Sequence, residues 1–212
     1  NKLDKTGLIG EEIDEETAKN KVKEFFENYD IKEIVLNAFL DKADIPGYDF
    51  SVKLRDEDIN LNIFISKKGG HVVQMSFDRE VNEEKISNAE AIDIGKRFLD
   101  DKKYFNMKET YFIKESNVIT INYAYNDSGI TVYPDLIKVK IALDNGEVFG
   151  LETTGYLNSH KQRLNLEKGI SIDKAREHLN KDLNVLSEGM AIIPTEWKTE
   201  ILCYEFKGKV ED

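Results

Sequence analysis

Cysteine is almost absent from this chain, in which Cys203 is the one thiol among 212 residues. A single cysteine excludes an internal disulfide and any metal site built from several thiolates. Histidine is scarce too, and three scattered residues do not offer the three or four ligands of a zinc site. No apolar run approaches the roughly 20 residues of a membrane span, and no signal-peptide pattern is present. We therefore expect no metal and no other cofactor.

Positive charge is in deficit, because 30 Lys and Arg stand against 41 Asp and Glu, for a net charge of −11. Binding to nucleic acid or to an anionic lipid surface needs clustered Lys and Arg, so we expect neither as a partner of this chain. The fractions of 40% hydrophobic and 33% charged residues are typical of a water-soluble globular chain. The chain starts at Asn1 and not at Met, and one interpretation is that it is part of something longer.

One six-residue motif, which begins with Ile and ends with Ala, occurs three times, over residues 13–18, 86–91 and 170–175. A short polar residue follows the Ile each time, namely Asp14, Ser87 or Ser171, and such residues cap helix N-termini. Apolar residues then recur at intervals of three and four, as far as Leu179 and Leu183 in the third copy. The pattern predicts three amphipathic helices of about 12–15 residues.

Between these helices the apolar residues alternate with polar ones, over residues 48–54, 119–125 and 137–143. Such alternation is typical of antiparallel strands with one packed face, and Gly69-Gly70 and Asn145-Gly146 are hairpin signals. We predict an α+β fold of tandem units, each with one helix packed on a small antiparallel sheet. The predicted parts are a lead-in segment (1–10), two units (11–80 and 81–165) and an incomplete third unit (166–212). Its sheet is expected to be short, with an unpaired edge.

The residues that carry a family resemblance lie in the second and third predicted units. A helix beginning Ile-Ser-x-x-x-Ala, with strands that close on the hairpin at residues 144–148, resembles the PepSY repeat. Residues 133–148, with Gly155-Tyr156-Leu157 and His160 after them, resemble the C-terminal region of the YpeB family of spore germination proteins. Ile193-Pro194 and residues 203–206 resemble the last repeat of that family. The resemblance covers essentially the whole chain.

The resemblance implies a protein that is not an enzyme. YpeB-like proteins carry tandem PepSY repeats outside the membrane, behind an N-terminal anchor, and the spore-cortex-lytic hydrolase SleB depends on them for its presence and stability in dormant spores. The implied function is to bind, stabilise and hold SleB in check during sporulation and dormancy. The implied place is the outer face of the spore inner membrane. A general PepSY-type inhibitor of a secreted peptidase is the alternative, and an enzyme acting on cortex glycan is a third hypothesis.

No catalytic, cofactor-binding or metal-binding residue is predicted. Ser159 and His160 are neighbours in sequence, whereas the members of a catalytic triad converge from separate loops. His71 falls in a predicted turn and His178 on the third predicted helix, and both are expected to be ordinary surface or half-buried residues.

A protein-binding patch is predicted in the most family-like stretch of the chain, in loops or at strand ends. Its residues are Tyr133, Pro134, Asp135, Tyr156 and His160. The alternative is that Tyr133-Pro134 only makes rigid the loop that enters the strand at Ile137. The acidic net charge is expected to solvate the surface, and it is also suited to attract a basic partner.

Overall fold

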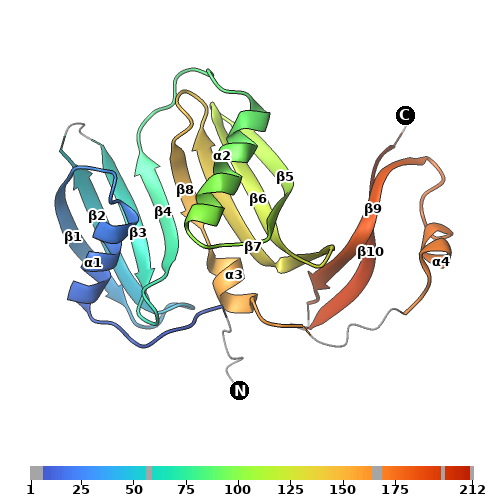
Figure 1. The fold of residues 1–212 in the computed structure, drawn as a ribbon, viewed down its shortest axis with the longest axis horizontal. Coiled ribbons are helices and arrows are strands. Elements are labelled where there is room, and N and C mark those ends of the chain that lie inside the picture. The colour runs from blue at the N-terminus through green and yellow to red at the C-terminus, as the bar shows by residue number, and fades with distance from the viewer. Residues whose placement is uncertain (1–6, 56–58, 164–168, 197–198, 211–212) are drawn as a thin grey trace.

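A computed structural model describes residues 7–55, 59–163, 169–196 and 199–210 of the chain (Figure 1). Strands dominate the described part, so the predicted mixed α+β class is confirmed. Its helices are α1 (Glu15–Phe25), α2 (Asn88–Asp101), α3 (Thr154–Ser159) and α4 (Ile172–Arg176). Its strands are β1 (Ile31–Leu40), β2 (Gly47–Leu54), β3 (Asn60–Ser66), β4 (Val72–Asp78), β5 (Met107–Glu115), β6 (Val118–Asp127), β7 (Ile130–Ala142), β8 (Val148–Glu152), β9 (Leu183–Pro194) and β10 (Glu200–Val210).

The strands form one continuous sheet in place of the separate small sheets predicted from the sequence. Its main path runs β1-β2-β3-β4-β8-β7-β6-β5 with antiparallel neighbours, and β4 pairs with β8 over residues 74–76 and 150–152. β9 runs parallel to the beginning of β7, and β10 pairs with β9. The physical reason is that an exposed strand edge presents unpaired N–H and C=O groups, and a neighbouring strand satisfies them.

The first two helices begin where the sequence predicts. Asp14 accepts a hydrogen bond from the Thr17 backbone N–H at 2.9 Å, and Ser87 and Glu90 form a complete capping box. Both helices lie on one face of the sheet (Figure 1), and their apolar stripes form with it the main core. The helices meet where the rings of Phe25 and Phe98 approach edge to face, with centroids 6.1 Å apart.

The third predicted helix is wrong in length. α4 has five residues, none of them buried, and Leu183 begins β9 instead of extending the helix. His178, placed on that helix by the sequence, follows its end. A short helix is marginal unless it buries an apolar face, and α4 contacts β9 through the exposed ion pair of Arg176 with Glu188 at 2.7 Å. In the described part β10 has β9 as its neighbour and no strand on its other edge, while both strands are long, with 12 and 11 residues.

Candidate functional site

The predicted patch begins at a bulge in the middle of β7. Ala124 on β6 lies opposite Leu136, but the next residue, Tyr125, lies opposite Val132. Residues 133–135 are therefore left without partners on β6. Pro134 has no N–H to donate, so it fits a position outside the ladder. β7 also changes its other neighbour here, from β9 over residues 130–132 to β8 over residues 138–141.

A buried ion network fastens this bulge. Asp135 is fully buried, and its two carboxylate oxygens accept hydrogen bonds from Nη1 and Nη2 of Arg163 at 2.9 and 2.7 Å. The Arg163 side chain is only 3% exposed, and its Nε and Nη2 donate to Glu200 on β10 at 2.9 and 2.8 Å. One guanidinium thus joins two carboxylates that come from β7 and β10.

The charges of the network shift the protonation of its members. Burial lowers the pKa of the Arg163 guanidinium, but hydrogen bonds and charges from Glu200 and Asp135 outweigh this and raise the pKa above its ordinary value. The hydrogen bond from Arg163 lowers the pKa of Glu200, against the opposing effect of its burial. Both groups are therefore held in their charged forms at neutral pH.

An aromatic cluster lies beside the ion network. His160 Nδ1 is 2.8 Å from Asp135, and because a carboxylate only accepts, this nitrogen carries a proton. The His160 ring stacks on Tyr156 with centroids 4.2 Å apart and meets Tyr125 edge to face at 4.7 Å. Burial, followed by the charges of Tyr104 and Asp135, raises the pKa of the Tyr156 hydroxyl to about 12. Tyr156 is thus a neutral, rigid platform.

The structure brings all five predicted residues together where the bulge of β7, the Arg163 network and the aromatic cluster meet, a region called the junction below. Tyr133 donates a hydrogen bond to Glu205 of β10, and with Pro134 it borders a groove of about 340 Å³ that also involves Lys138, Glu152 and Pro194. Asp135 is buried, so its carboxylate serves the network rather than an outer surface. Whether the other four contact a partner remains a prediction. Sequence reasoning missed Arg163 and Glu200, since nothing in the local sequence marks two residues 37 positions apart as partners.

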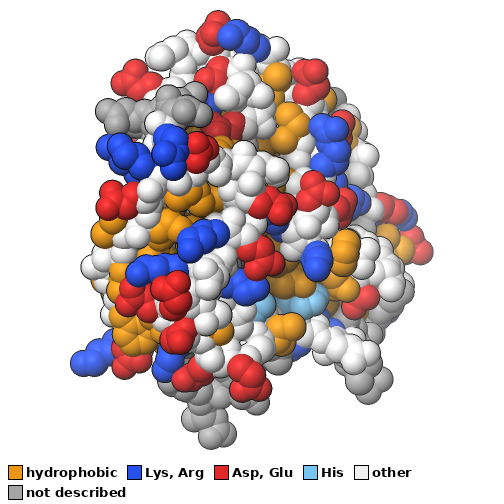
Figure 2. All heavy atoms as spheres, turned by 60° about the vertical axis from the view of Figure 1, so that its left-hand side comes forward, with side chains coloured by type: hydrophobic (Ala, Val, Ile, Leu, Met, Phe, Trp, Pro, Cys, Tyr) orange, Lys and Arg blue, Asp and Glu red, His pale blue; other side chains and the backbone are white. Residues whose placement is uncertain are grey.

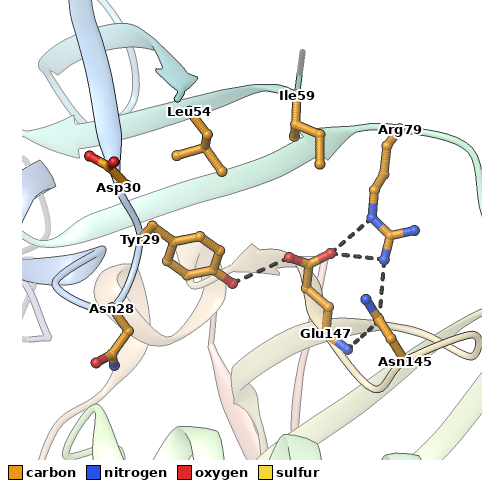
Figure 3. A pocket seen from close by; sticks show the side chains of 8 residues that line it. All are labelled: Asn28, Tyr29, Asp30, Leu54, Ile59, Arg79, Asn145 and Glu147. Carbon is orange, nitrogen blue, oxygen red and sulfur yellow. Dashed lines mark hydrogen bonds and ion pairs between the residues drawn. The ribbon is translucent and has the colours of Figure 1, made fainter. Parts of the chain in front are cut away.

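A second polar site lies at the seam between the segment that follows α1 and the turn from β7 to β8 (Figure 3). Arg79, after β4, donates hydrogen bonds to Asp144 at 2.8 Å and to Glu147 at 2.9 Å, and the Tyr29 hydroxyl lies 3.3 Å from Glu147. Tyr29, Arg79 and Glu147 border a cavity of about 380 Å³. Because Arg79 pairs with both Asp144 and Glu147, the site is suited to clamping the seam rather than to proton transfer.

Histidines and metal ligands remain scattered in the described part of the chain. His71 Nε2 lies 2.7 Å from the Ile9 carbonyl oxygen, so this histidine holds the segment before α1. Among the residues that the structure describes, no three His, Cys, Asp or Glu gather into a metal-binding group. Over the face seen from the β1 end, acidic and basic side chains are interspersed with exposed hydrophobic ones (Figure 2). That face therefore carries no patch of one sign.

A family model described as the PepSY1 and PepSY2 domains of the YpeB sporulation protein matches residues 1–166. The chain belongs to the YpeB family. The matched part holds the bulge of β7, His160 and Arg163, whereas Glu200 lies beyond it. Membership of the YpeB family supports a role in sporulation and germination.

Relatives of known name agree with the YpeB assignment. The sporulation protein YpeB of Oceanobacillus iheyensis is 32% identical over 97% of this chain and 45% of its own length. That of Bacillus subtilis is 32% identical over 97% of this chain and 46% of its own length. The solved C-terminal domain of Bacillus megaterium YpeB has a TM-score of 0.83 and 28% identity, covering 96% of this chain and 90% of that one. The chain spans just under half the length of the curated relatives.

None of the helices in the described ranges is both long and apolar enough to cross a bilayer.

Acid is expected to weaken the Arg163 network. The pKa of Glu200 is below its usual 4.5 in the folded chain, so the stability it contributes is fully present above the unfolded pKa and is lost as the pH falls through the folded value. The melting temperature should hold steady above about pH 5 and decline below about pH 4.5. Glu200→Gln should melt below the wild type at neutral pH, with a gap that closes as the pH falls towards about 3. A gap of constant size across this range would contradict the expectation.

Proposed function

We propose that this chain is a non-catalytic binding part of a sporulation protein, which binds, stabilises and holds in check the cortex-lytic hydrolase SleB. The observation that carries the proposal is the family match over residues 1–166, supported by relatives named as sporulation protein YpeB. By the same resemblance, the protein acts at the outer face of the spore inner membrane.

The fold suits a protein that binds without catalysing. We infer that it is built from repeated units, α1 with β1–β4 and α2 with β5–β8, followed by α4 with β9 and β10. The same order of one helix and four strands in the first two supports this, as do the like caps at Asp14, Ser87 and Ser171. Pairing of β4 with β8 and of β7 with β9 makes the sheet continuous. A continuous sheet holds its surface grooves in a fixed geometry, which lowers the entropic cost of binding.

The groove at the bulge of β7 is the proposed contact surface. Tyr133 and Pro134 present half-buried side chains there, and tyrosine is enriched at protein interfaces because it joins a large apolar ring to a polar tip. The bound hydrolase would be protected in proportion to the occupied fraction, since any protein that binds only the folded state of another stabilises it by mass action.

Co-elution of this chain with purified SleB at low salt is the test. The wild type is expected to co-elute, and Tyr133→Ala to weaken binding about tenfold or more, as interface tyrosines often do. The matched control is Tyr204→Ala on β10, a half-exposed tyrosine that lies outside the groove. Both variants must keep the wild-type circular dichroism spectrum.

The outcomes separate the hypotheses. No co-elution at low salt would refute SleB binding by this chain, and equal binding by both variants would move the contact away from the groove. Inhibition of secreted peptidases in a panel, without SleB binding, would favour the alternative of a general PepSY-type inhibitor. Release of dye from labelled cortex by the chain alone would make it an enzyme.

A further inference from the structure

Strand β5 at one end of the main sheet path has an apolar edge that faces solvent. In the part of the chain that the structure describes, β6 is the one strand paired with it. Three consecutive large side chains are exposed there, Tyr111 by 49%, Phe112 by 39% and Ile113 by 53%. A long apolar edge strand is a template for pairing with another strand. Proteins either protect such an edge against pairing or use it as an interface.

A bulge decides which side chains of β5 share a face. Glu109 lies opposite Tyr123, but Tyr111 lies opposite Asn122, so Thr110 is the extra residue. Side chains on the α2 face of the sheet, where the Tyr123 hydroxyl donates to the Ile92 carbonyl, are therefore those of Glu109, Phe112 and Lys114. Those on the other face are Lys108, Tyr111, Ile113 and Glu115.

When β5 pairs antiparallel with β5 of a second copy, its charged residues face residues of opposite charge. With Phe112 opposite Phe112 of an antiparallel second copy, each step outward pairs residues from the same face. The first step brings Tyr111 opposite Ile113 of the other copy. With Thr110 passed over as the extra residue, as it is against β6, the next steps bring Glu109 opposite Lys114 and Lys108 opposite Glu115. The twofold axis makes each of these pairs occur twice. Opposite charges directly across a ladder are favourable and like charges are unfavourable.

We propose that β5 is a homodimer interface, in which the edges of two copies of this chain pair antiparallel about a twofold axis at Phe112. The occupant is a second copy because the register that places Phe112, Tyr111 and Ile113 against apolar residues also places all four charged residues opposite the other sign. Charges of one sign would repel an identical strand, whereas β5 carries both signs, with Lys108 and Lys114 against Glu109 and Glu115. The interface is independent of hydrolase binding at the groove beside β7.

Two local contacts involve residues of the β5 edge. Lys114 forms an ion pair with Glu84 at 3.0 Å, and both side chains are 40% exposed. At the bulge, Lys207 donates to the Thr110 carbonyl oxygen at 3.3 Å, which ties the β9–β10 hairpin near the start of the edge. A dimer would therefore place Lys114 between Glu84 of its own chain and Glu109 of the other copy.

Analytical ultracentrifugation of the 212-residue chain at low salt tests this pairing. The wild type is expected to show a concentration-dependent dimer. Lys114→Glu and Glu109→Lys should each weaken dimerisation about tenfold or more, because each places like charges opposite each other at two positions. The double variant Glu109→Lys/Lys114→Glu should restore it. An equimolar mixture of the two single variants should form a heterodimer, in which both pairs are again of opposite sign.

Glu84→Gln is the control for the local ion pair of Lys114. It leaves the edge intact and is expected to dimerise like the wild type. A monomer at all concentrations for the wild type would overturn the proposal. So would a dimer that Lys114→Glu leaves unchanged, or a mixture of the single variants that stays monomeric. Retention of the wild-type circular dichroism spectrum by each variant excludes misfolding as the cause.

Discussion

Replacing Arg163 with Met is expected to lower the free energy of unfolding by about 3–5 kcal/mol, as for other buried ion pairs that lose one partner. The Arg163 side chain is 3% exposed, and its guanidinium satisfies Asp135, which is fully buried, and Glu200, which is 20% exposed. Methionine fills much of the same volume but donates no hydrogen bond. Asp135 and Glu200 would then lose the guanidinium that they share, although Lys161 still lies 3.5 Å from Glu200. Chemical denaturation followed by circular dichroism measures the loss.

The matched control is Arg55→Met, which removes an ion pair whose partners Arg55 and Asp30 are 61% and 56% exposed. An exposed pair contributes about 0–1 kcal/mol, so its loss should barely move the transition. Neutralising the carboxylates as well, with Asp135→Asn and Glu200→Gln in the Arg163→Met background, should recover part of the stability. If the free energies of unfolding of Arg163→Met and Arg55→Met differed by less than about 1 kcal/mol, the network would not stabilise the junction.

Phe26→Ala is expected to lower the free energy of unfolding by about 3–5 kcal/mol, the range for a fully buried phenylalanine. Phe26 is 2% exposed at the end of α1, and its ring meets those of Phe25, Tyr29 and Phe77 edge to face with centroids 5.0, 5.5 and 6.3 Å apart. Removing the ring leaves a cavity between α1 and the sheet that rigid neighbours fill only in part. Denaturation in urea gives the change directly.

Phe105→Ala serves as the control, because its side chain is 59% exposed and its loss should stay within about 0.5 kcal/mol. Phe25 and Phe98, the other phenylalanines of the two helix stripes, are only partly buried. Phe25→Ala or Phe98→Ala should therefore lower the free energy of unfolding less than Phe26→Ala does. A Phe26→Ala variant as stable as Phe105→Ala would mean that α1 is not fastened to the sheet through this ring.

The elements that could be predicted depend on residues close together in the sequence. The cap at Ser87 and Glu90 is a contact across three positions, and the turns at Gly69-Gly70 and Asn145-Gly146 join neighbouring strands. The positive φ angles at Gly70 and Gly146, of 65° and 79°, explain why glycine stands there. α4 is the exception among the helices, because its length depended on whether a sheet lay beneath it.

Five residues of the junction could be chosen from the sequence only because a resemblance marked the stretch that holds them. Their arrangement could not be derived, since Arg163 meets Asp135 across 28 positions and Glu200 across 37. The bulge that isolates residues 133–135 likewise depends on how β6 and β7 align. No local pattern encodes contacts of this length.

The sequence by itself determined the capped starts of α1 and α2, the alternating strands, the hairpin turns and the family, because each is set by short-range sterics, hydrogen bonding or a residue pattern. Only the tertiary structure decided that β4 pairs with β8 and β9 with β7, that α4 stays short, and that Arg163 lies between two carboxylates. Edge pairing and ion-pair burial depend on which surfaces meet when the chain folds. The chain has many strand edges and charged residues, and its sequence does not show which of them will pair.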